Sequence, residues 1–253
     1  MAGLLIVAAI TACSPSTQSD DSDLTIFAAA SLRDVFVDLE AAWLTTHPDT
    51  SLTLAHEASN VLAAQISEGA PADVFVSADT ERPQQLLEAH LVAAEPVPFA
   101  GNRVALVVPT EGDRVQSPAD LAEPGVRIVA AGRGVPITRY TDEALAQLAL
   151  TMPDPEAFAA AVSSNIVSRE DNVRAALAKV ELGEGDAAIV FRTDAMSSDR
   201  VREIPLPAVI DITAEYAVVQ VSDRGTAADL VEWLGGPEAS DVIEAAGFEV
   251  VHP

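Results

Sequence analysis

The chain has 253 residues, of which 39 are acidic and 14 are basic, so its net charge at pH 7 is −25. Apolar residues make up 49% of the chain, which excludes intrinsic disorder despite the charge. Such an acidic protein would repel the phosphates of a nucleic acid, and a single cysteine excludes a disulfide framework and a zinc site built from cysteines. The length suffices for one large domain or for two modest lobes with a buried core.

The first twelve residues carry no charge and contain the apolar run Leu4–Ile10. This run is far shorter than the roughly 20 residues that a membrane-spanning helix needs, and it fits the apolar part of a secretory signal. We therefore expect residues 1–12 to be a signal peptide. Because such peptides normally begin with Lys or Arg and the first three residues have neither, we expect the true start to lie upstream.

The end of this segment, Ile10-Thr11-Ala12-Cys13, resembles a bacterial lipobox. The resemblance implies that Cys13 receives a lipid, becomes the mature N-terminus and anchors the protein to the outer face of the cell membrane. Residues 13–23 would then form a polar, flexible tether. An unmodified Cys13 in an ordinary apolar N-terminus remains the alternative.

From residue 24 onward, short apolar runs alternate with helical periodicities. Strands are predicted at 24–30, 51–55, 73–76, 103–109, 126–131, 187–191, 215–221 and 248–251. Helices are predicted at 31–46, 59–68, 81–90, 141–150, 155–162, 172–182, 226–234 and 238–246. This alternation predicts an α/β protein with parallel sheets, which bind ligands at the carboxyl ends of their strands beside helix N-termini.

Several predicted helices begin with a hydroxyl side chain. Ser31 with Asp34 and Ser168 with Asp171 have the spacing of capping boxes, and Ser59 opens the helix at 59–68. Taken singly, each is explained by helix capping. If two or more such helix starts met in one cleft, their free N–H groups and dipoles would form an anion site without any cationic side chain.

Longer stretches of the chain resemble the periplasmic molybdate-binding proteins of ABC transporters. The matching segments are 28–34, 65–79, 172–177, 185–186, 189–190 and 194–195. The most specific of them contains Gly-Ala-Pro-Ala-Asp-Val-Phe-Val-Ser-Ala-Asp, and the matches run in order from about 24 to 251, nearly the whole mature chain. The resemblance implies a two-lobe type II periplasmic-binding-protein fold that holds one tetrahedral oxyanion, molybdate or tungstate, in the inter-lobe cleft.

The same resemblance implies how the chain is divided and what it works with. Lobe 1 would comprise residues 24–103 and 215–253, lobe 2 would comprise residues 104–214, and a hinge would join them. A protein of this kind is a monomeric, extracytoplasmic binding protein and not an enzyme. It needs no cofactor, and it delivers its anion to the membrane permease of the transporter.

Carried over position by position, the resemblance assigns the anion to five residues. Ser31 and Ser59 would each give a hydroxyl and a backbone N–H, and Ile137 and Val173 would each give a backbone N–H. Phe191 stands where the family commonly has a tyrosine whose hydroxyl touches the anion. Losing that hydrogen bond would cost roughly 1.5–3 kcal/mol.

Phe191 keeps the identity of the anion open. Thr193 or a water molecule could replace the missing hydroxyl, or the same fold could bind sulfate or phosphate. The remaining alternative is a secreted serine hydrolase that uses Ser31 or Ser59 with His56 as its base. The chain has no Gly-x-Ser-x-Gly elbow for such a nucleophile, and its four histidines are scattered without ligand spacing for a metal ion.

Overall fold

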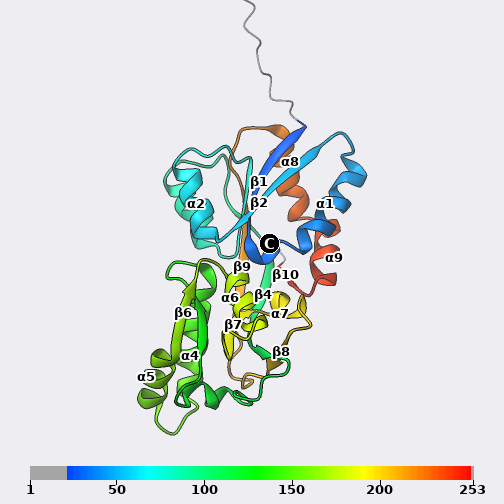
Figure 1. The fold of residues 1–253 in the computed structure, drawn as a ribbon. Helices are drawn as coiled ribbons and strands as arrows, with labels where there is room; N and C mark the ends of the chain where they lie inside the picture. The colour runs from blue at the N-terminus through cyan, green and yellow to red at the C-terminus, as the bar shows by residue number, and fades with distance from the viewer. Residues whose placement is uncertain (1–21, 252–253) are drawn as a thin grey trace, which may run out of the picture.

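The structure, a computed structural model, describes residues 22–251, so the predicted signal peptide and the predicted lipid attachment at Cys13 lie outside the described residues. Figure 1 shows two bodies stacked one above the other, each built from strands with helices packed against them. No helix within the described residues has the length and apolar character needed to cross a membrane.

The strands are short except for β4. They are β1 (Asp23–Ala29), β2 (Ser51–Glu57), β3 (Val74–Ser77), β4 (Val97–Pro109), β5 (Ile128–Ala131), β6 (Ile166–Glu170), β7 (Ala187–Phe191), β8 (Val201–Ile204), β9 (Thr213–Gln220) and β10 (Glu249–Val250).

The helices alternate with these strands. They are α1 (Val35–Thr46), α2 (Ser59–Ser67), α3 (Glu81–Glu88), α4 (Pro136–Ala149), α5 (Pro155–Asn165), α6 (Val173–Glu181), α7 (Arg192–Met196), α8 (Gly225–Leu234) and α9 (Pro237–Ala245), with the 3-10 helices η1 (Ala30–Leu32) and η2 (Pro118–Ala122).

One hydrogen-bonded path, β2-β1-β3-β9-β4-β7-β5-β6, runs through both bodies, and β8 and β10 also pair with β4. Strand β1 is parallel to β2 and β3, and β5 is parallel to β6 and β7, as the alternation predicts. Strand β4, with 13 residues, pairs antiparallel with β9 in one body and with β7 in the other. We call the body with β1–β3, α1, α2, α8 and α9 the upper body, and the body with β5–β7 and α4–α7 the lower body (Figure 1).

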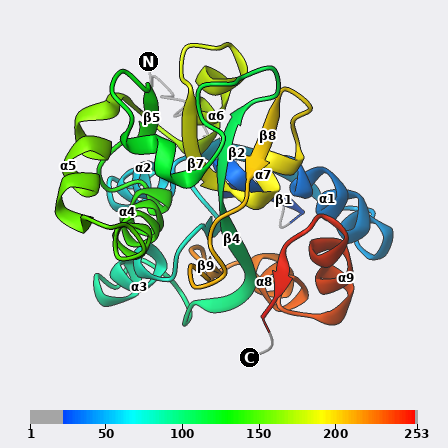
Figure 2. The same ribbon diagram turned by 90° about the horizontal axis from the view of Figure 1, so that it is seen from below.

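Helices cover the sheets, so the central strands are buried on both faces. Every residue of β3 and of β7 is buried, which explains why β7 is wholly apolar and why β3 is apolar up to its last residue, Ser77. In the upper body α1 packs against α9, and the two lie side by side in Figure 2. Phe36, Leu39 and Trp43 of α1 are at most 1% exposed, and burying each such side chain contributes roughly 1.5–3 kcal/mol.

The structure corrects both predicted capping boxes. Neither Ser31 nor Asp34 caps a helix, because the chain first forms η1 and α1 begins only at Val35. Ser168 lies in β6, a strand that the sequence does not predict, and Asn172 is the residue that caps α6. The half-exposed, partly charged sequence of β6 lacks the apolar run that marks a buried strand.

Helix α4 begins at Pro136, five residues before its predicted start at residue 141. Proline suits the first position of a helix because its fixed φ is helical and it has no N–H group that needs a partner there. Gly134 has a φ of +88°, the left-handed conformation that turns the chain from β5 into this helix. The earlier start places Ile137 in the first turn of α4.

Candidate functional site

The five residues that the resemblance assigns to the anion line one cavity between the two bodies. Each lies at the carboxyl end of a strand or in the helix that follows it, after β1, β2, β5, β6 and β7. Parallel strands end at the same edge of a sheet, so these ends face one another where the bodies meet. The other lining residues are Ala29, Ala30, Ala58, Ala78, Val135, Pro136 and Asn172.

The cavity is small and uncharged. The space between its lining atoms is about 220 Å³, counted together with the solvent at its open mouth. None of the described residues that line it has a charged side chain. Any attraction for an anion must therefore come from hydroxyl groups, backbone N–H groups and helix dipoles.

Helices α2 and α4 begin in the buried wall of this cavity without a side-chain cap. The residues before their first turns are Ala58 and Val135, whose side chains cannot accept a hydrogen bond. Ser59 and Ile137, in those first turns, are each 1% exposed. The first N–H groups of a helix have no intrahelical acceptor, so buried ones need a partner from elsewhere. A ligand with several acceptor oxygens would be such a partner.

Helix α6 contributes a third start. Asn172 caps it by accepting a hydrogen bond from the N–H of Ala175 at 3.0 Å. The N–H of Val173 is not part of this cap, and it has no intrahelical acceptor because Val173 is the first residue of the helix. The amide nitrogen of Asn172 also donates to Glu57 Oε2 in the upper body, at 3.2 Å. The positive ends of three helix dipoles thus converge on the cavity.

Fixed partners hold both serine hydroxyls. The N–H of Ala78 donates to Ser59 Oγ at 3.0 Å, so the proton of Ser59 stays available for a ligand. Ser31 Oγ lies 2.8 Å from Tyr216 Oη. Within residues 22–251 neither serine forms a hydrogen bond with a histidine, so nothing in this geometry supports the hydrolase interpretation with His56 as a base.

Phe191 forms an apolar part of the wall. Its ring meets those of Tyr140 and Tyr216 edge to face, with centroids 6.2 and 5.5 Å apart. Thr193 does not take the place of the missing tyrosine hydroxyl, because it does not line the cavity and its Oγ1 accepts a hydrogen bond from Asn102 Nδ2 at 2.8 Å.

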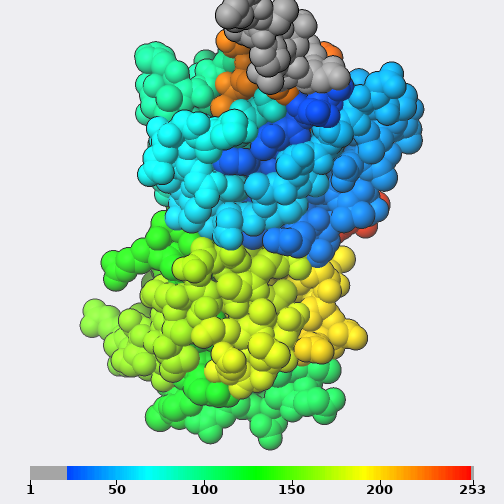
Figure 3. Space-filling model, turned by 45° about the horizontal axis from the view of Figure 1, so that its top comes forward, coloured from blue at the N-terminus to red at the C-terminus, as the bar shows by residue number. Residues whose placement is uncertain are grey.

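An ion pair joins the two bodies beside the cavity, and Figure 3 shows the two bodies in contact on one face of the molecule. Arg174, the residue after Val173, pairs with Asp34 of the upper body and with Asp194 of the lower body, each at 2.5 Å. Asp34 is exposed, whereas the side chain of Asp194 is fully buried. Burial, opposed by the charge of Arg174 and aided by the charge of Asp34, raises the pKa of Asp194 to about 7.

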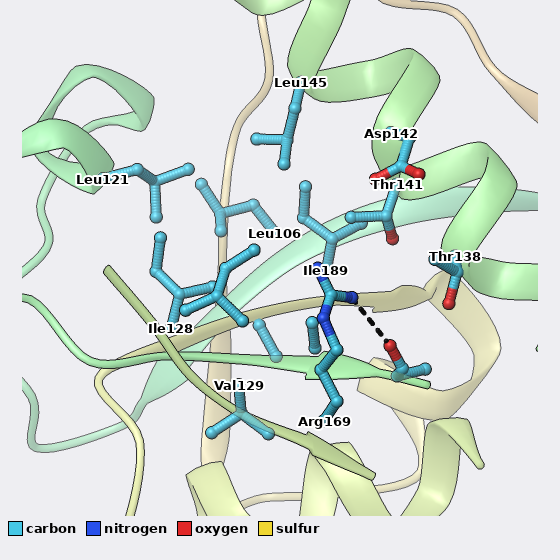
Figure 4. A pocket seen from close by; sticks show the side chains of 14 residues that line it. Leu106, Leu121, Ile128, Val129, Thr138, Thr141, Asp142, Leu145, Arg169 and Ile189 are labelled. Atoms are coloured by element: carbon cyan, nitrogen blue, oxygen red, sulfur yellow. Dashed lines mark hydrogen bonds between the residues drawn. The ribbon is translucent and has the colours of Figure 1, made fainter. Parts of the chain in front are cut away.

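A second cavity lies within the lower body between α4 and the sheet (Figure 4). Aliphatic side chains form most of its wall. Figure 4 shows Thr138, Asp142 and Arg169 on one side of it, where Arg169 donates to the carbonyl of Ala131 at 3.1 Å. None of the five predicted site residues lines this cavity. No cluster of three or more His, Cys, Asp or Glu side chains within the described part of the chain could hold a metal ion.

Comparisons with known proteins show the family of this chain and the proteins that it is similar to. A family model described as bacterial extracellular solute-binding protein matches residues 24–249. The molybdate-binding protein ModA of Mycobacterium tuberculosis is 27% identical over 260 residues, which cover 96% of this chain and 94% of ModA. YvgL of Bacillus subtilis, which is named an ABC transporter substrate-binding lipoprotein, is 32% identical over 260 residues, covering 96% of each protein.

Solved structures share the fold. The periplasmic molybdate-binding protein of Azotobacter vinelandii matches with a TM-score of 0.73 and 21% identity, covering 91% of this chain and 99% of that one. The sulfate-binding protein SubI of Mycobacterium tuberculosis matches with a TM-score of 0.77 and 18% identity, covering 92% and 88%. The predicted periplasmic-binding-protein fold is therefore confirmed. The chain belongs to the family of bacterial extracellular solute-binding proteins, and the resemblance to the molybdate-binding proteins of ABC transporters is confirmed.

Proposed function

We propose that this protein captures molybdate, or the closely similar tungstate, in the cavity between its two bodies and delivers it to the permease of an ABC transporter. The starts of α2 and α4, which have no side-chain cap, carry the proposal, because the N–H groups of Ser59 and Ile137 have no hydrogen-bond acceptor within the described residues. In this proposal Ser31 and Ser59 donate hydroxyl and backbone hydrogens, Ile137 and Val173 donate backbone hydrogens, and Phe191 closes the wall.

The net charge of −25 does not oppose this function at close range. Charges beyond the Debye length of about 8 Å are screened at physiological salt, whereas the N–H groups of the cavity act at contact. We expect the overall charge to slow the capture of a dianion without abolishing its binding.

The proposal includes two lobes that close on the anion. Lobe 1, residues 24–103 and 215–253, corresponds to the upper body, and lobe 2, residues 104–214, to the lower body. Closure would bring Ser31 and Ser59 against Ile137 and Val173, and opening would release the anion to the permease. The contacts of Arg174 with Asp34 and of Asn172 with Glu57 join the two bodies in this structure and support its assignment as the closed form.

We further propose that the mature protein is a monomer anchored outside the cytoplasm by a lipid on Cys13. The lipobox-like sequence before Cys13 supports the anchor, as does the name of the relative YvgL. Mass spectrometry of the membrane fraction would test it, by looking for a diacylglyceryl group on Cys13.

Sulfate or phosphate is the second candidate ligand. Phe191 favours it, since the wall lacks the hydroxyl that the family commonly offers to molybdate, and SubI, which shares the fold, is a sulfate-binding protein. Titration calorimetry and thermal unfolding with molybdate, tungstate, sulfate and phosphate would decide. A ligand at 100 times its Kd adds about 2.7 kcal/mol of stability. If only sulfate or phosphate shifted the melting temperature, the molybdate proposal would be wrong.

A further inference from the structure

A buried chain of hydrogen bonds leads away from Ser31 into the core. Ser31 Oγ lies 2.8 Å from Tyr216 Oη, and Asn102 Nδ2 donates to Tyr216 Oη at 3.3 Å and to Thr193 Oγ1 at 2.8 Å. Tyr216 is 0% exposed, Asn102 1% and Ser31 3%, so the protein itself, and not bulk water, determines where their protons point. Of these residues only Ser31 lines the cavity.

The amide of Asn102 turns its nitrogen toward Tyr216 and Thr193, and its oxygen is buried without a hydrogen-bond partner within the described residues. In this orientation the amide sets the direction of the hydrogen bonds. An amide nitrogen only donates, so Tyr216 Oη accepts from Asn102 and retains one proton of its own. If Ser31 also donated to Tyr216, the tyrosine proton would be buried without an acceptor, which costs about 1–3 kcal/mol. If Tyr216 donates to Ser31 instead, each of these protons has a partner and the Ser31 proton is left for the cavity.

The tyrosine is well suited to this role. Burial raises the pKa of Tyr216 well above its usual value, and the charge of Asp194 raises it further, so the hydroxyl keeps its proton. Ser59 Oγ likewise accepts a hydrogen bond, in this case from the N–H of Ala78, so its own proton is not used within the protein. Both serines therefore face the cavity as hydrogen-bond donors. The only other polar side chain in the wall, Asn172, already uses its oxygen to accept from Ala175.

We propose that Tyr216 and Asn102 are positioning residues that hold the Ser31 proton toward the cavity, and that they thereby select fully deprotonated tetrahedral oxyanions over anions that carry a proton. The inference rests on the proposed function of the same site. It predicts discrimination against inorganic phosphate, which retains a proton at neutral pH and needs an acceptor for it. Molybdate, tungstate and sulfate need only donors.

The decisive variant is Tyr216→Phe, which removes the hydroxyl and keeps the ring against Phe191 and Phe248. Ser31 would then be free to turn and to accept a proton. We expect affinity for molybdate to fall about 10-fold or more, and affinity for phosphate to fall less or to rise. The measured quantity is the ratio of the two Kd values at pH 7, which should change by about 10-fold in favour of phosphate.

A second variant should reverse the direction of these hydrogen bonds. In Asn102→Asp the side chain accepts, so it draws the Tyr216 proton away from Ser31, and the ratio should shift at least as far as in Tyr216→Phe. The matched control is Tyr140→Phe. The ring of Tyr140 also packs against Phe191, but its hydroxyl accepts a hydrogen bond from Arg139 and is not bonded to a serine. The ratio should stay as in the wild type. Thermal unfolding of each variant separates lost binding from lost folding.

An unchanged Kd ratio in Tyr216→Phe would show that Tyr216 is only a core residue, and wild-type protein that prefers phosphate would also overturn the inference. Neutron diffraction gives a readout that needs no ligand, because it locates the deuteron on Tyr216 Oη. A deuteron directed at Ser31 supports the inference, and one directed at Asn102 overturns it. If the wild type bound none of the four anions, the proposed function would fail while the neutron map still decided the direction of the chain.

Discussion

The two sides of the cavity offer hydrogen-bond donors in different ways. On the upper side, Ser31 and Ser59 present hydroxyl groups that depend on the identity of the side chain and on the partners that orient it. On the lower side, the proposed donors at Ile137 and Val173 are backbone N–H groups, which any residue except proline would supply. Substitutions can therefore tune the upper side, whereas the lower side is determined by where α4 and α6 begin.

The largest effect on binding is expected from removing a hydroxyl on the upper side. Ser31→Ala and Ser59→Ala should each weaken anion binding by about 1.5–3 kcal/mol, roughly 10-fold to 100-fold, because a hydrogen bond to a charged group is lost. Ser59→Ala also leaves the buried N–H of Ala78 without its acceptor, so its stability should fall as well. Calorimetry and thermal unfolding measure the two effects.

Ser67→Ala is the matched control for these serines. Ser67 lies at the other end of α2 and donates to the carbonyl of Ala63, away from the cavity. Its substitution should leave affinity unchanged. If Ser59→Ala behaved like this control, the hydroxyl of Ser59 would not contact the anion.

The buried carboxyl of Asp194, behind the lower side, should make stability depend on pH. In the unfolded chain an Asp loses its proton near pH 3.9, whereas folding raises the pKa of Asp194 to about 7. Between these values the folded state holds the extra proton, so this residue's contribution to stability falls as pH rises, by at most about 1.4 kcal/mol per pH unit.

Asp194→Asn removes this titration. Relative to the wild type, the variant's free energy of unfolding should therefore rise between pH 5 and pH 7, as measured by urea denaturation. A difference between the two proteins that stays constant with pH would contradict the raised pKa.

Adding a hydroxyl to the lower side would make it more like the upper side. Phe191→Tyr should tighten binding of molybdate by about tenfold if the new hydroxyl reaches the anion, since such a hydrogen bond is worth about 1.5 kcal/mol or more. Phe191→Leu keeps the wall apolar and is the comparison. Weaker binding by the tyrosine variant would mean that the cavity has no room for the hydroxyl beside the ligand.

A smaller effect is expected where the two sides are joined. Asp34→Asn removes the charge that pairs with Arg174 across the bodies. Because Asp34 is exposed, the pair contributes about 1 kcal/mol or less, so the dissociation rate of the anion should rise less than about fivefold. Stopped-flow measurements at low and high salt would show the effect, which should disappear at high salt.

The smallest effect on binding is expected at Ile137. Ile137→Val keeps the N–H that the proposal uses, so affinity should remain within about twofold while stability falls by about 0.5–1.5 kcal/mol through lost packing. A large loss of affinity would contradict the proposed difference between the two sides, because the identity of the side chain would then affect binding on the lower side too.

Local patterns predict much of the fold. The mostly apolar run of β1, the wholly apolar run of β7 and the helical spacing of α1 are features of the nearby sequence alone. Strands β6 and β8 are short and partly polar, and they form because neighbouring strands offer ladder partners. The resemblance to a known family leads to the five residues that line the cavity, and their role as ligands stays a prediction.

The sequence does not show which side chains, distant from each other in the chain, form hydrogen bonds with one another. Ser31 has the spacing of a capping residue, yet its hydroxyl bonds to Tyr216, 185 positions later. Nothing in the sequence marks Tyr216 or Asn102 as a site residue. A buried tyrosine or asparagine in a strand has no local pattern that indicates its hydrogen-bond partner. Only the pairing of β9 with β4 brings these two side chains together.

Because β4 is hydrogen-bonded to β9 in the upper body and to β7 in the lower body, one continuous ladder runs through the molecule. A ladder of this kind can bend and twist, but it cannot be pulled apart without breaking backbone pairs. Exchange of the anion should therefore proceed by a rotation of the bodies about this shared strand that keeps every rung intact. Amide hydrogen exchange in β4 should then stay slow even without ligand, while the starts of α2, α4 and α6 become protected when the anion binds.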